Sequence, residues 1–517
     1  MKYLSHTLLI AAGSIIGTAL GSAPSGHTVE PVKSKLTFAR DVAPILYSKC
    51  ASCHHEGEVA PFSLMSYDDA RAKSLTIAAV VQQKFMPPWH AVSHGEFTND
   101  RSLTAGQIAT LTDWAKAGAP AGDLSKAPIP PTFSSNWHIG QPDFSAKLPK
   151  PYAVGAEGPD EFRCFVVPTD FDKDRFVSEV ELKPGNRKIV HHIVIYVSTT
   201  GEARKLDGKD GKPGYASFGG AGVPVTGILG VWAPGLQPIS APQGTGIMLP
   251  KGADIILQVH YHRDGKAEED QSEIGLKFSS RPVDKKICTT LFGTSLISIP
   301  KESTQAETAA DMYLSTPITI YDVFPHMHML GHDMQMMATL PNGSKQELFK
   351  VNNYDFNWQT RYIYRNPVHL PTGTHLELIA HYDNSTGNVR NPSNPPKTVW
   401  FGEQTTDEMC FAICNFSVDD EHLLANKGHL GGIAVPGKSQ TLERVFDRFD
   451  TTHSGFLDVA QFADVVNEYQ LGKGRSPGRY NPKAISAYFI GLVGKTQKGK
   501  ISKAEFISQL LITEFGN

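Results

Sequence analysis

Two cysteines and a histidine lie close together near the N-terminus. Cys50 and Cys53 are separated by two residues and His54 follows directly, in the run CASCH. This spacing puts two thiols one turn apart, where they can bond the vinyl groups of a haem while the adjacent imidazole binds the iron. A dithiol redox pair and half of a zinc site are the alternatives, but the sequence has no second CxxC and no thioredoxin-like pattern around the motif. The motif therefore predicts one covalently bound haem c.

A second axial ligand for the iron must come from the same segment. Met86 stands in the run KFMPPW, where two prolines stiffen the chain in an extended form that can present a thioether. Met65, His55 and His90 are alternatives, and methionine often fills the core of a small helical segment, so the residues alone leave the ligand open. The run from FARDVAPILYSKCASCH to WAKAGAP resembles bacterial c-type cytochrome domains over nearly its whole length. This resemblance implies Met86.

Three histidine clusters and one methionine form a second group that could do chemistry. They are His191 and His192 in KIVHHIVIYV, His260 and His262 in LQVHYHRD, His326 and His328 in FPHMHMLG, and Met409 in TTDEMC. Residues two apart on a strand share a face, so the second and third clusters can each chelate one ion. Adjacent histidines face opposite sides of a regular strand, so the first pair can share an ion only at a bulge or a twisted end. Imidazoles with a thioether favour copper, whereas zinc with a carboxylate is the alternative and no HExxH motif is present.

The order of four motifs resembles a known family. VHH before an apolar strand, LQVHY, HxH followed by Leu-Gly, and DEMC are similar to the motifs of copper type II, ascorbate-dependent monooxygenases, such as the peptidylglycine α-hydroxylating and dopamine β-monooxygenases. The resemblance covers residues 136–432 and implies two jelly-roll domains with one copper each. The implied ligand sets are His191, His192 and His260 for a copper that transfers electrons, and His326, His328 and Met409 for the catalytic copper that activates O2. His262 is then a bystander, although geometry alone does not exclude it.

The resemblance implies hydroxylation of an unactivated C–H bond, in which substrate, O2, two electrons and two protons give an alcohol and water. The partners are O2, a small organic substrate and an electron donor, either an ascorbate-like reductant or a redox protein. Peptide-amidating members bind a peptide carboxylate with an arginine and a tyrosine, but Phe324 and Ile413 stand at those places here. An apolar pair cannot balance a carboxylate, so the sequence predicts a substrate other than a glycine-extended peptide.

The last 80 residues contain two loops with EF-hand spacing. In the first, Asp450, Ser454 and Asp458 hold ligand positions, but Gln461 replaces the glutamate that grips calcium with two oxygens. The second, over residues 494–505, carries three lysines. The second loop favours a paired helix–loop–helix without calcium, and the first leaves calcium binding open. Any calcium affinity is expected to be weak, with a Kd of ~10⁻⁴ M or poorer.

Hydrophobic periodicity indicates the elements that position these groups. Residues 36–122 predict helices, because Thr104 and Gln107 form a capping box before an apolar face and Gly118 ends it. A Pro-rich linker follows over 123–135. Residues 136–432 alternate short β-branched runs with turn clusters, which predicts two β sandwiches, over 136–282 and 283–432. Residues 437–517 are helical again. The predicted fold class is multidomain, with an all-α c-type cytochrome, two β jelly rolls and an α-helical EF-hand-like pair.

Composition and the N-terminus limit the function classes. The 517 residues carry 49 basic and 52 acidic side chains, a formal charge of −3, so no basic face for non-specific nucleic-acid binding is expected. The apolar run LLIAAGSIIGTAL after Lys2 is too short to span a membrane and is followed by small residues, which predicts a cleaved signal peptide over residues 1–23 and export to the periplasm. Of the six cysteines, Cys164, Cys288, Cys410 and Cys414 could form at most two disulfides, whose pairing the sequence does not fix.

These observations predict an exported haem–copper monooxygenase with one haem c and two coppers. Two other functions stay open. One is a periplasmic electron-transfer or copper-handling protein that holds the metals without hydroxylation. The other is a binding module in which the tail recruits a partner and the β domains serve as a scaffold.

Overall fold

The computed structural model describes residues 36–58, 60–133, 137–217, 219–402, 404–429, 433–436, 440–472 and 480–507. The predicted signal peptide lies outside these residues. Among the described helices, none is long and apolar enough to cross a membrane.

The N-terminal segment, residues 36–126, holds short helices. They are η1 (Phe38–Val42), α1 (Ala43–Lys49), α2 (Tyr67–Ala72), α3 (Ser74–Gln82), α4 (Ala105–Lys116) and η2 (Leu124–Lys126). The predicted capping box is present at α4, where the Thr104 side chain accepts from the Gln107 backbone N–H and the Gln107 side chain accepts from Thr104. The helices pack around buried Phe38, Leu46 and Trp114, so the apolar stripe of α4 positions the loop that carries CASCH.

An extended stretch of the same segment runs along the β region. Backbone hydrogen bonds join Val92 N to Lys350 O (2.8 Å) and Thr98 N to Ile363 O (2.8 Å). The Asn99 side chain donates to the carbonyl of Arg361 (2.6 Å). Ala91 and Phe97 are buried in the core of the β region rather than in that of the helices. The N-terminal segment is therefore fastened to the β region along residues 90–99.

The first β unit, residues 144–278, contains two facing sheets. Its elements are β1 (Phe144–Lys147), β2 (Tyr152–Val154), β3 (Glu161–Pro168), β4 (Arg175–Lys183), β5 (Val190–Ser198), α5 (Glu202–Leu206), β6 (Tyr215–Ala216), β7 (Gly227–Trp232), β8 (Ile239–Ser240), β9 (Thr245–Leu249), β10 (Asp254–Tyr261), β11 (Glu268–Asp270) and β12 (Glu273–Phe278). One sheet has the order β6-β3-β10-β5-β7, with β10 buried on both faces between two neighbours. This burial explains why β10 has the near-continuous apolar run DIILQV.

The second β unit, residues 285–436, is built in the same way. Its elements are β13 (Lys285–Thr294), β14 (Ser298–Ile299), β15 (Ala306–Leu314), β16 (Ile318–His326), β17 (Gly331–Thr339), β18 (Lys345–Val351), η3 (Phe356–Trp358), β19 (Tyr362–Leu370), β20 (His375–Tyr382), β21 (Val399–Trp400), β22 (Cys410–Val418), η4 (Leu423–Ala425) and β23 (Ala434–Pro436). One sheet has the order β18-β17-β20-β15-β23. β20 alternates buried and half-buried side chains because one of its faces covers the core.

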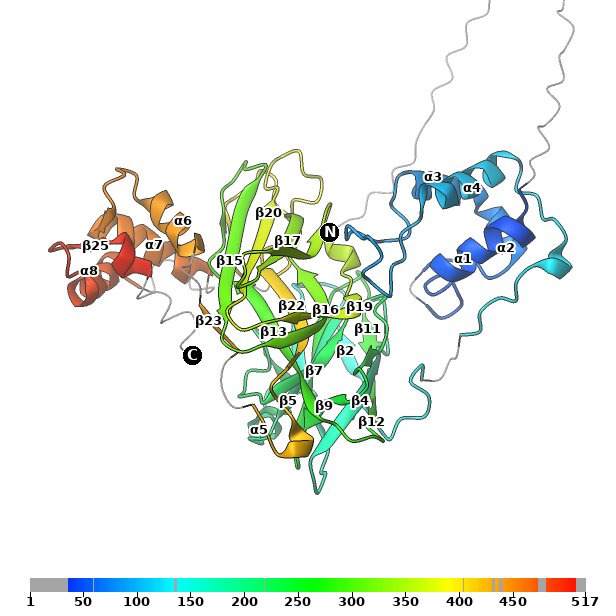
Figure 1. Ribbon diagram of the computed structural model, residues 1–517, viewed down its shortest axis with the longest axis horizontal. Helices are drawn as coiled ribbons and strands as arrows, with labels where there is room; N and C mark the ends of the chain where they lie inside the picture. Colours follow the sequence, from blue (N-terminus) through cyan, green and yellow to red (C-terminus); the bar gives the residue numbers. More distant parts are fainter. Residues whose placement is uncertain are drawn as a thin grey trace, which may run out of the picture.

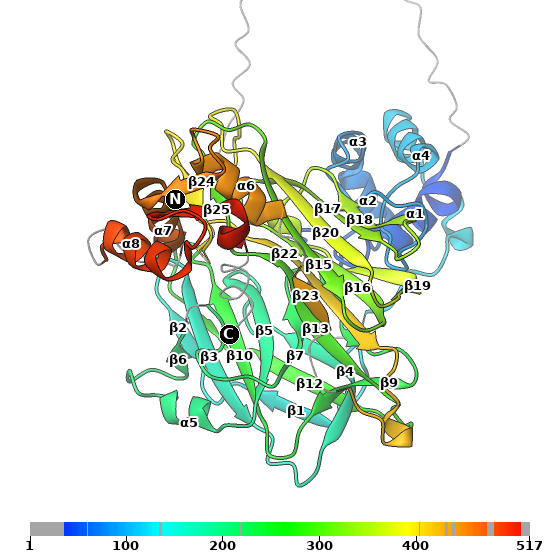
Figure 2. The same ribbon diagram turned by 60° about the vertical axis from the view of Figure 1, so that its left-hand side comes forward.

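Strand β13 joins the two units. It pairs in parallel with β9 and antiparallel with β22, so a nine-stranded sheet, β1-β12-β4-β9-β13-β22-β16-β19 with β8 beside β4, runs through both units. Figure 2 shows the strands of the first unit below those of the second. Each unit nevertheless has its own apolar core.

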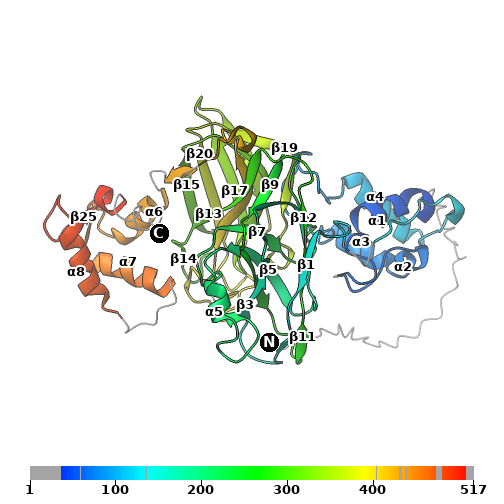
Figure 3. The same ribbon diagram turned by 90° about the horizontal axis from the view of Figure 1, so that it is seen from below.

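The tail, residues 440–507, consists of α6 (Gln440–Phe449), β24 (Phe456–Asp458), α7 (Val459–Gly472), α8 (Pro482–Val493) and β25 (Lys500–Ser502). The two loops pair through an antiparallel bridge in which Leu457 lies opposite Ile501. Arg448 donates to the Ser298 carbonyl (3.4 Å), and α6 lies against β15. The tail and the N-terminal helices flank the β region from opposite sides (Figures 1 and 3).

The predicted fold class was wrong. The chain is mostly β, with 34% in strands and 20% in helices, and among the described residues no separate all-α cytochrome domain is evident. The physical reason is that residues 90–99 pack on the second β unit instead of on the helices. Ala91 and Phe97 are buried in the core of that unit and form isolated β-bridges with it. The expected all-helical tail also contains a β bridge, and β13 joins the expected sandwiches into one sheet.

Candidate metal centres and haem cavity

The first histidine cluster, His191, His192 and His260, lies on neighbouring strands β5 and β10. His260 pairs with His192, but the next residue, Tyr261, pairs with Val190, so His191 is the extra residue of a β-bulge. The Nδ1 atom of His192 lies 3.2 Å from that of His191 and 3.4 Å from that of His260. The three imidazoles offer ligand atoms within 4.8 Å of one another. The bulge thus supplies the irregularity that two adjacent histidines need to face one ion.

A carboxylate fixes the orientation of one ring in this cluster. Asp160 accepts a hydrogen bond from Nε2 of His260 (2.9 Å) and another from Nδ1 of His262 (3.1 Å). Because Nε2 of His260 carries the proton, its Nδ1 keeps a lone pair for a metal. Burial alone would raise the pKa of Asp160, but the two histidines outweigh burial and lower it well below its usual range. His262 bonds to Asp160 and stays outside the cluster.

Burial holds two imidazoles of the first cluster, those of His191 and His192, in the neutral form. Burial, reinforced by the charge of His260, lowers the pKa of His191 to about 3. The pKa of His192 is lowered well below its usual value, again mainly by burial. Phe162 stacks on His260, with ring centroids 4.2 Å apart. Neutral imidazoles are the form that binds a metal.

The second histidine cluster, His326 and His328, lies at the end of β16 and in the turn that follows. Nδ1 of His326 donates to Oε1 of Gln359 (2.6 Å), and Nδ1 of His328 donates to the carbonyl of Asp407 (3.1 Å). These bonds leave Nε2 of each ring as the atom that could bind a metal. The ring centroids are 5.2 Å apart, and burial lowers the pKa of both side chains.

Met409, the predicted third ligand, is tied to this cluster through its neighbours. The buried carboxylate of Glu408 accepts from the backbone N–H of His328 (2.8 Å), Leu330 (2.6 Å) and Met409 (3.3 Å). The Tyr382 hydroxyl donates to the Met409 carbonyl (2.8 Å). Burial raises the pKa of Glu408 to about 8. Glu408 was not among the predicted site residues, although an acid directly before a predicted ligand was a signal for it.

A single phenylalanine lies between the two histidine clusters. The Phe356 ring stacks on His191, with centroids 4.9 Å apart and planes at 20°. Its edge meets His328, with centroids 5.5 Å apart and planes at 79°. The two clusters therefore face each other across one aromatic ring, although they belong to different β units.

The predicted haem residues surround an apolar cavity of about 420 Å³. Cys50, Cys53, His54 and Met86 all line it, and this volume lies in the range of cofactor sites. His54 donates from Nδ1 to the Phe62 carbonyl (3.0 Å), which leaves Nε2 for an iron. Burial lowers the pKa of His54, so its imidazole is neutral. The described residues therefore fit a haem.

The alternative iron ligands lie elsewhere. Met65, His55 and His90 do not line this cavity. His55 bonds to the Ala51 carbonyl (2.8 Å) and stacks on Phe133, with ring centroids 3.8 Å apart. One lining residue, Trp358, comes from the β region and was not predicted, because nothing in the sequence near CASCH points to residue 358.

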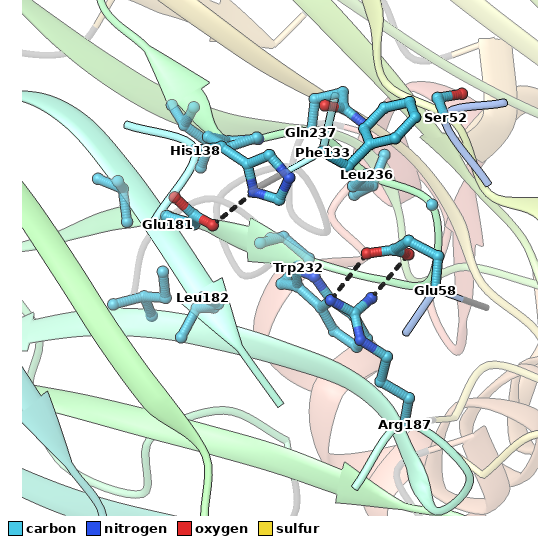
Figure 4. Close-up of a pocket in the computed structure, with 16 residues that line it drawn as sticks. Ser52, Glu58, Phe133, His138, Glu181, Leu182, Arg187, Trp232, Leu236 and Gln237 are labelled. Carbon is cyan, nitrogen blue, oxygen red and sulfur yellow. Dashed lines mark hydrogen bonds and ion pairs between the residues drawn. The ribbon is translucent and has the colours of Figure 1, made fainter. Parts of the chain in front are cut away.

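A smaller cavity of about 90 Å³ lies where the N-terminal segment meets the first β unit (Figure 4). Glu58, which follows CASCH, forms a two-point ion pair with Arg187, with N···O distances of 3.1 Å. On the opposite wall His138 donates to Glu181 (2.7 Å). The cavity is smaller than the sites that hold small molecules, which start at ~300 Å³. It is an interface in which the haem-motif loop is held against the residues preceding β5.

The loops of the tail already bond to their own carboxylates. The Asp450 carboxylate accepts from the backbone N–H of Ser454 (3.0 Å) and Gly455 (2.7 Å). Asp458 accepts from the N–H groups of Ala460 (2.8 Å) and Gln461 (2.9 Å) at the start of α7. Burial would raise the pKa of Asp450, but the backbone hydrogen bonds outweigh it and lower the pKa.

Residues 288–418 match the family model of the copper type II ascorbate-dependent monooxygenase C-terminal domain. This match contains His326, His328 and Met409, and it supports a copper monooxygenase function with O2, a substrate and an ascorbate reductant. No protein of curated function matches the chain.

Solved structures add no argument. The subviral particle of infectious bursal disease virus VP2 is 9% identical, with a TM-score of 0.17 and coverage of 54% of this chain and 73% of that chain. The PBSX exported protein XepA is 9% identical, with a TM-score of 0.16 and coverage of 46% and 86%. PNGF-II is 10% identical, with a TM-score of 0.21 and coverage of 51% and 60%. Similarity at these TM-scores carries no inference about this chain.

The residues that depart from the peptide-amidating pattern lie side by side. Phe324 of β16 pairs with Ile413 of β22, two positions before His326 along the strand. Phe324 is buried and Ile413 is half-buried. No disulfide joins the six cysteines, and Cys410 and Cys414 are buried in the core of the second β unit.

Proposed function

We propose that this protein is an exported haem–copper monooxygenase that hydroxylates a C–H bond of a small organic substrate with O2. The observation that carries the proposal is the second histidine cluster, which leaves the Nε2 atoms of both rings available to a metal. The cluster and the predicted third ligand, Met409, both lie in the part of the chain that matches the family model of the monooxygenase C-terminal domain. Copper bound there would supply O2 activation. The chain's own residues orient the ligands, exclude water from them and keep the imidazoles neutral.

The first cluster would hold a second copper through three Nδ1 atoms. Three imidazoles without an added carboxylate ligand suit an ion that changes between Cu(I) and Cu(II). Phe356 keeps this cluster in contact with His328. This shared contact supports two coppers that exchange electrons across one aromatic ring.

Cys50, Cys53, His54 and Met86 would bind one haem c, which supplies one-electron transfer. The thioether of Met86 would be the second axial ligand. If so, oxidised wild-type protein shows the thioether–iron charge-transfer band, and Met86→Ala removes it. A band that is absent from the wild type, or that survives the substitution, refutes this ligand.

The substrate is small and organic, and the Phe324–Ile413 pair argues against a peptide carboxylate at that place. Glycine-extended peptides should therefore be hydroxylated no faster than the background. Rapid amidation-type hydroxylation of such peptides would contradict this part of the proposal. The remaining proposals are export to the periplasm, directed by residues 1–23, and a tail that docks on the second β unit with weak calcium binding at most.

A copper-handling or electron-transfer protein without hydroxylation is the second candidate, because the first cluster alone would serve it. The test is O2 uptake by copper-loaded, haem-loaded protein across a panel of small organic compounds. A monooxygenase consumes O2 only with a substrate and yields one hydroxylated product per O2. Copper reduction without any substrate-dependent O2 uptake would favour the second candidate. Protein that binds no stoichiometric copper would instead be a scaffold.

A further inference from the structure

One short turn touches the haem cavity and both histidine clusters. The relay turn, residues 356–359, comprises η3 and the residue after it. Phe356 lies between the clusters, Trp358 lines the cavity, and Gln359 bonds to His326. These three contacts connect the cavity of the N-terminal segment, the first cluster in the first β unit and the second cluster in the second β unit.

The cavity end of the turn is aromatic. Trp358 is half-buried and lines the same cavity as Cys53, His54 and Met86. It is the lining residue contributed by the β region. A tryptophan π system at the wall of a haem site offers delocalised orbitals that couple to a bound macrocycle.

The cluster end of the turn is a hydrogen bond. From Trp358 the path crosses one peptide bond to Gln359, whose Oε1 lies 2.6 Å from Nδ1 of His326. Nε2 of Gln359 donates to the Phe356 carbonyl (3.2 Å), which fixes which end of the amide faces the histidine. The path from the cavity to the ligand ring thus contains covalent bonds and one short hydrogen bond, with no through-space jump after Trp358.

The turn is held at both ends. The Tyr354 hydroxyl donates to the Met327 carbonyl (2.8 Å), between the two ligand histidines. The Asp355 side chain caps η3 by accepting from the Asn357 N–H (3.0 Å). Beyond the turn, Arg361 donates to the Pro238 carbonyl of the first β unit (3.0 Å). Such anchoring gives the path a fixed length, which a hydrogen-bonded electron route requires.

We infer that the relay turn is the electron route from the haem cavity to the copper ligands, with Trp358 and Gln359 leading to His326 and Phe356 linking His328 to His191. This inference rests on the proposed function. Each event moves one electron: haem Fe(II) is oxidised to Fe(III), one Cu(II) is reduced to Cu(I), and no proton is transferred. The external electron donor then restores Fe(II).

The test is stopped-flow spectroscopy without O2 or substrate. Holoprotein with Cu(II) in place is mixed rapidly with a photochemically generated one-electron reductant, which reduces the haem to Fe(II). The oxidation of the haem that follows is measured by its visible absorbance. Wild type should show a phase whose rate is independent of protein concentration. Trp358→Leu should slow this phase at least tenfold, and Trp358→Phe should slow it less. Gln359→Leu should also slow it, whereas Gln359→Glu keeps a hydrogen-bond acceptor and should be faster than Gln359→Leu.

Trp137→Leu is the matched control, because this half-buried tryptophan lies against Lys183 instead of the cavity and should leave the rate unchanged. Haem spectrum and copper content must equal those of wild type in every variant compared. A wild type without the phase refutes haem-to-copper delivery in the proposed function and the relay with it. A wild-type phase that Trp358→Leu leaves unchanged refutes the relay alone.

Discussion

The two histidine clusters present opposite ring nitrogens. In the first, Asp160 accepts a hydrogen bond from Nε2–H of His260, and the Nδ1 atoms converge. In the second, the Gln359 side chain and the Asp407 carbonyl accept hydrogen bonds from the Nδ1–H groups and leave each Nε2 available to a metal. Since the hydrogen bond at one ring nitrogen sets the role of the other, the partners decide which atom meets the ion.

The clusters also differ in their support. The first stands on adjacent strands of one sheet, where backbone pairing fixes the rings. In the second, His326 is the last residue of β16 and His328 lies in the turn that follows, where the Glu408 carboxylate accepts from three backbone N–H groups. The second cluster should therefore be easier to damage by changing residues that are not ligands.

The largest expected effect separates the clusters by function. His326→Ala should lower turnover by about three orders of magnitude, or ~4 kcal/mol, because it removes a proposed ligand of the copper that would activate O2. The copper of the first cluster should stay bound. Product formation and copper content are measured together, with His375→Ala, whose ring pairs with Asp311, as the control. Retained turnover in the His326 variant would show that the catalytic copper is elsewhere.

A change at Asp160 should affect one cluster only. Asp160→Asn should weaken copper binding at the first cluster by about 10- to 100-fold, because the amide no longer holds His260 Nε2–H as strongly. Copper at the second cluster should keep its affinity. Competition with a chelator measures both affinities, and His262→Ala, which loses the other bond to Asp160, should change neither. Equal weakening at both clusters would contradict separate partner control.

Glu408→Gln tests the support of the second cluster. An amide can accept at one oxygen but not from all three N–H groups, so the variant should lose about 1–3 kcal/mol in the free energy of unfolding. Urea unfolding followed by protein fluorescence measures the loss. Asp407→Asn, which keeps the carbonyl that holds His328, should lose less. A Glu408 variant as stable as wild type would show that the turn does not depend on this carboxylate.

The tail should show the smallest effect, because its loop carboxylates already accept backbone hydrogen bonds and Gln461 offers one neutral oxygen. We expect a calcium Kd of ~10⁻⁴ M or poorer by calorimetry, with Asp450→Ala lowering even this weak binding. Micromolar calcium binding that Asp450→Ala abolishes would show that the first loop is a true calcium site.

The sequence pointed to candidate ligands more readily than to the groups that hydrogen-bond to them. CASCH and the histidine pairs are local patterns, so short spacing was enough to single them out as candidates. Asp160 lies 100 residues before His260, and Gln359 lies 33 residues after His326, so only the fold brings them together. Two adjacent histidines can share an ion only at a bulge or a twisted strand end, and β5 has a bulge at His191.

The fold class failed for a related reason. Helical periodicity over residues 36–122 predicted an independent all-α domain, because signals such as the capping box at Thr104 are local. The burial of Ala91 and Phe97 in the second β unit depends on β18 and β19, more than 250 residues away, as the bridges to Val351 and Tyr364 show. Periodicity carries no information about such pairing.

Copper analysis of three proteins tests the central claim most directly. Purified wild type, His260→Ala and His326→Ala are loaded with copper, passed through a desalting column and analysed for copper, zinc and haem per chain. Separate clusters predict two coppers in wild type, one in each variant, and one haem in all three. One copper in wild type, a preference for zinc, or the loss of both coppers in either variant would contradict two independent copper sites.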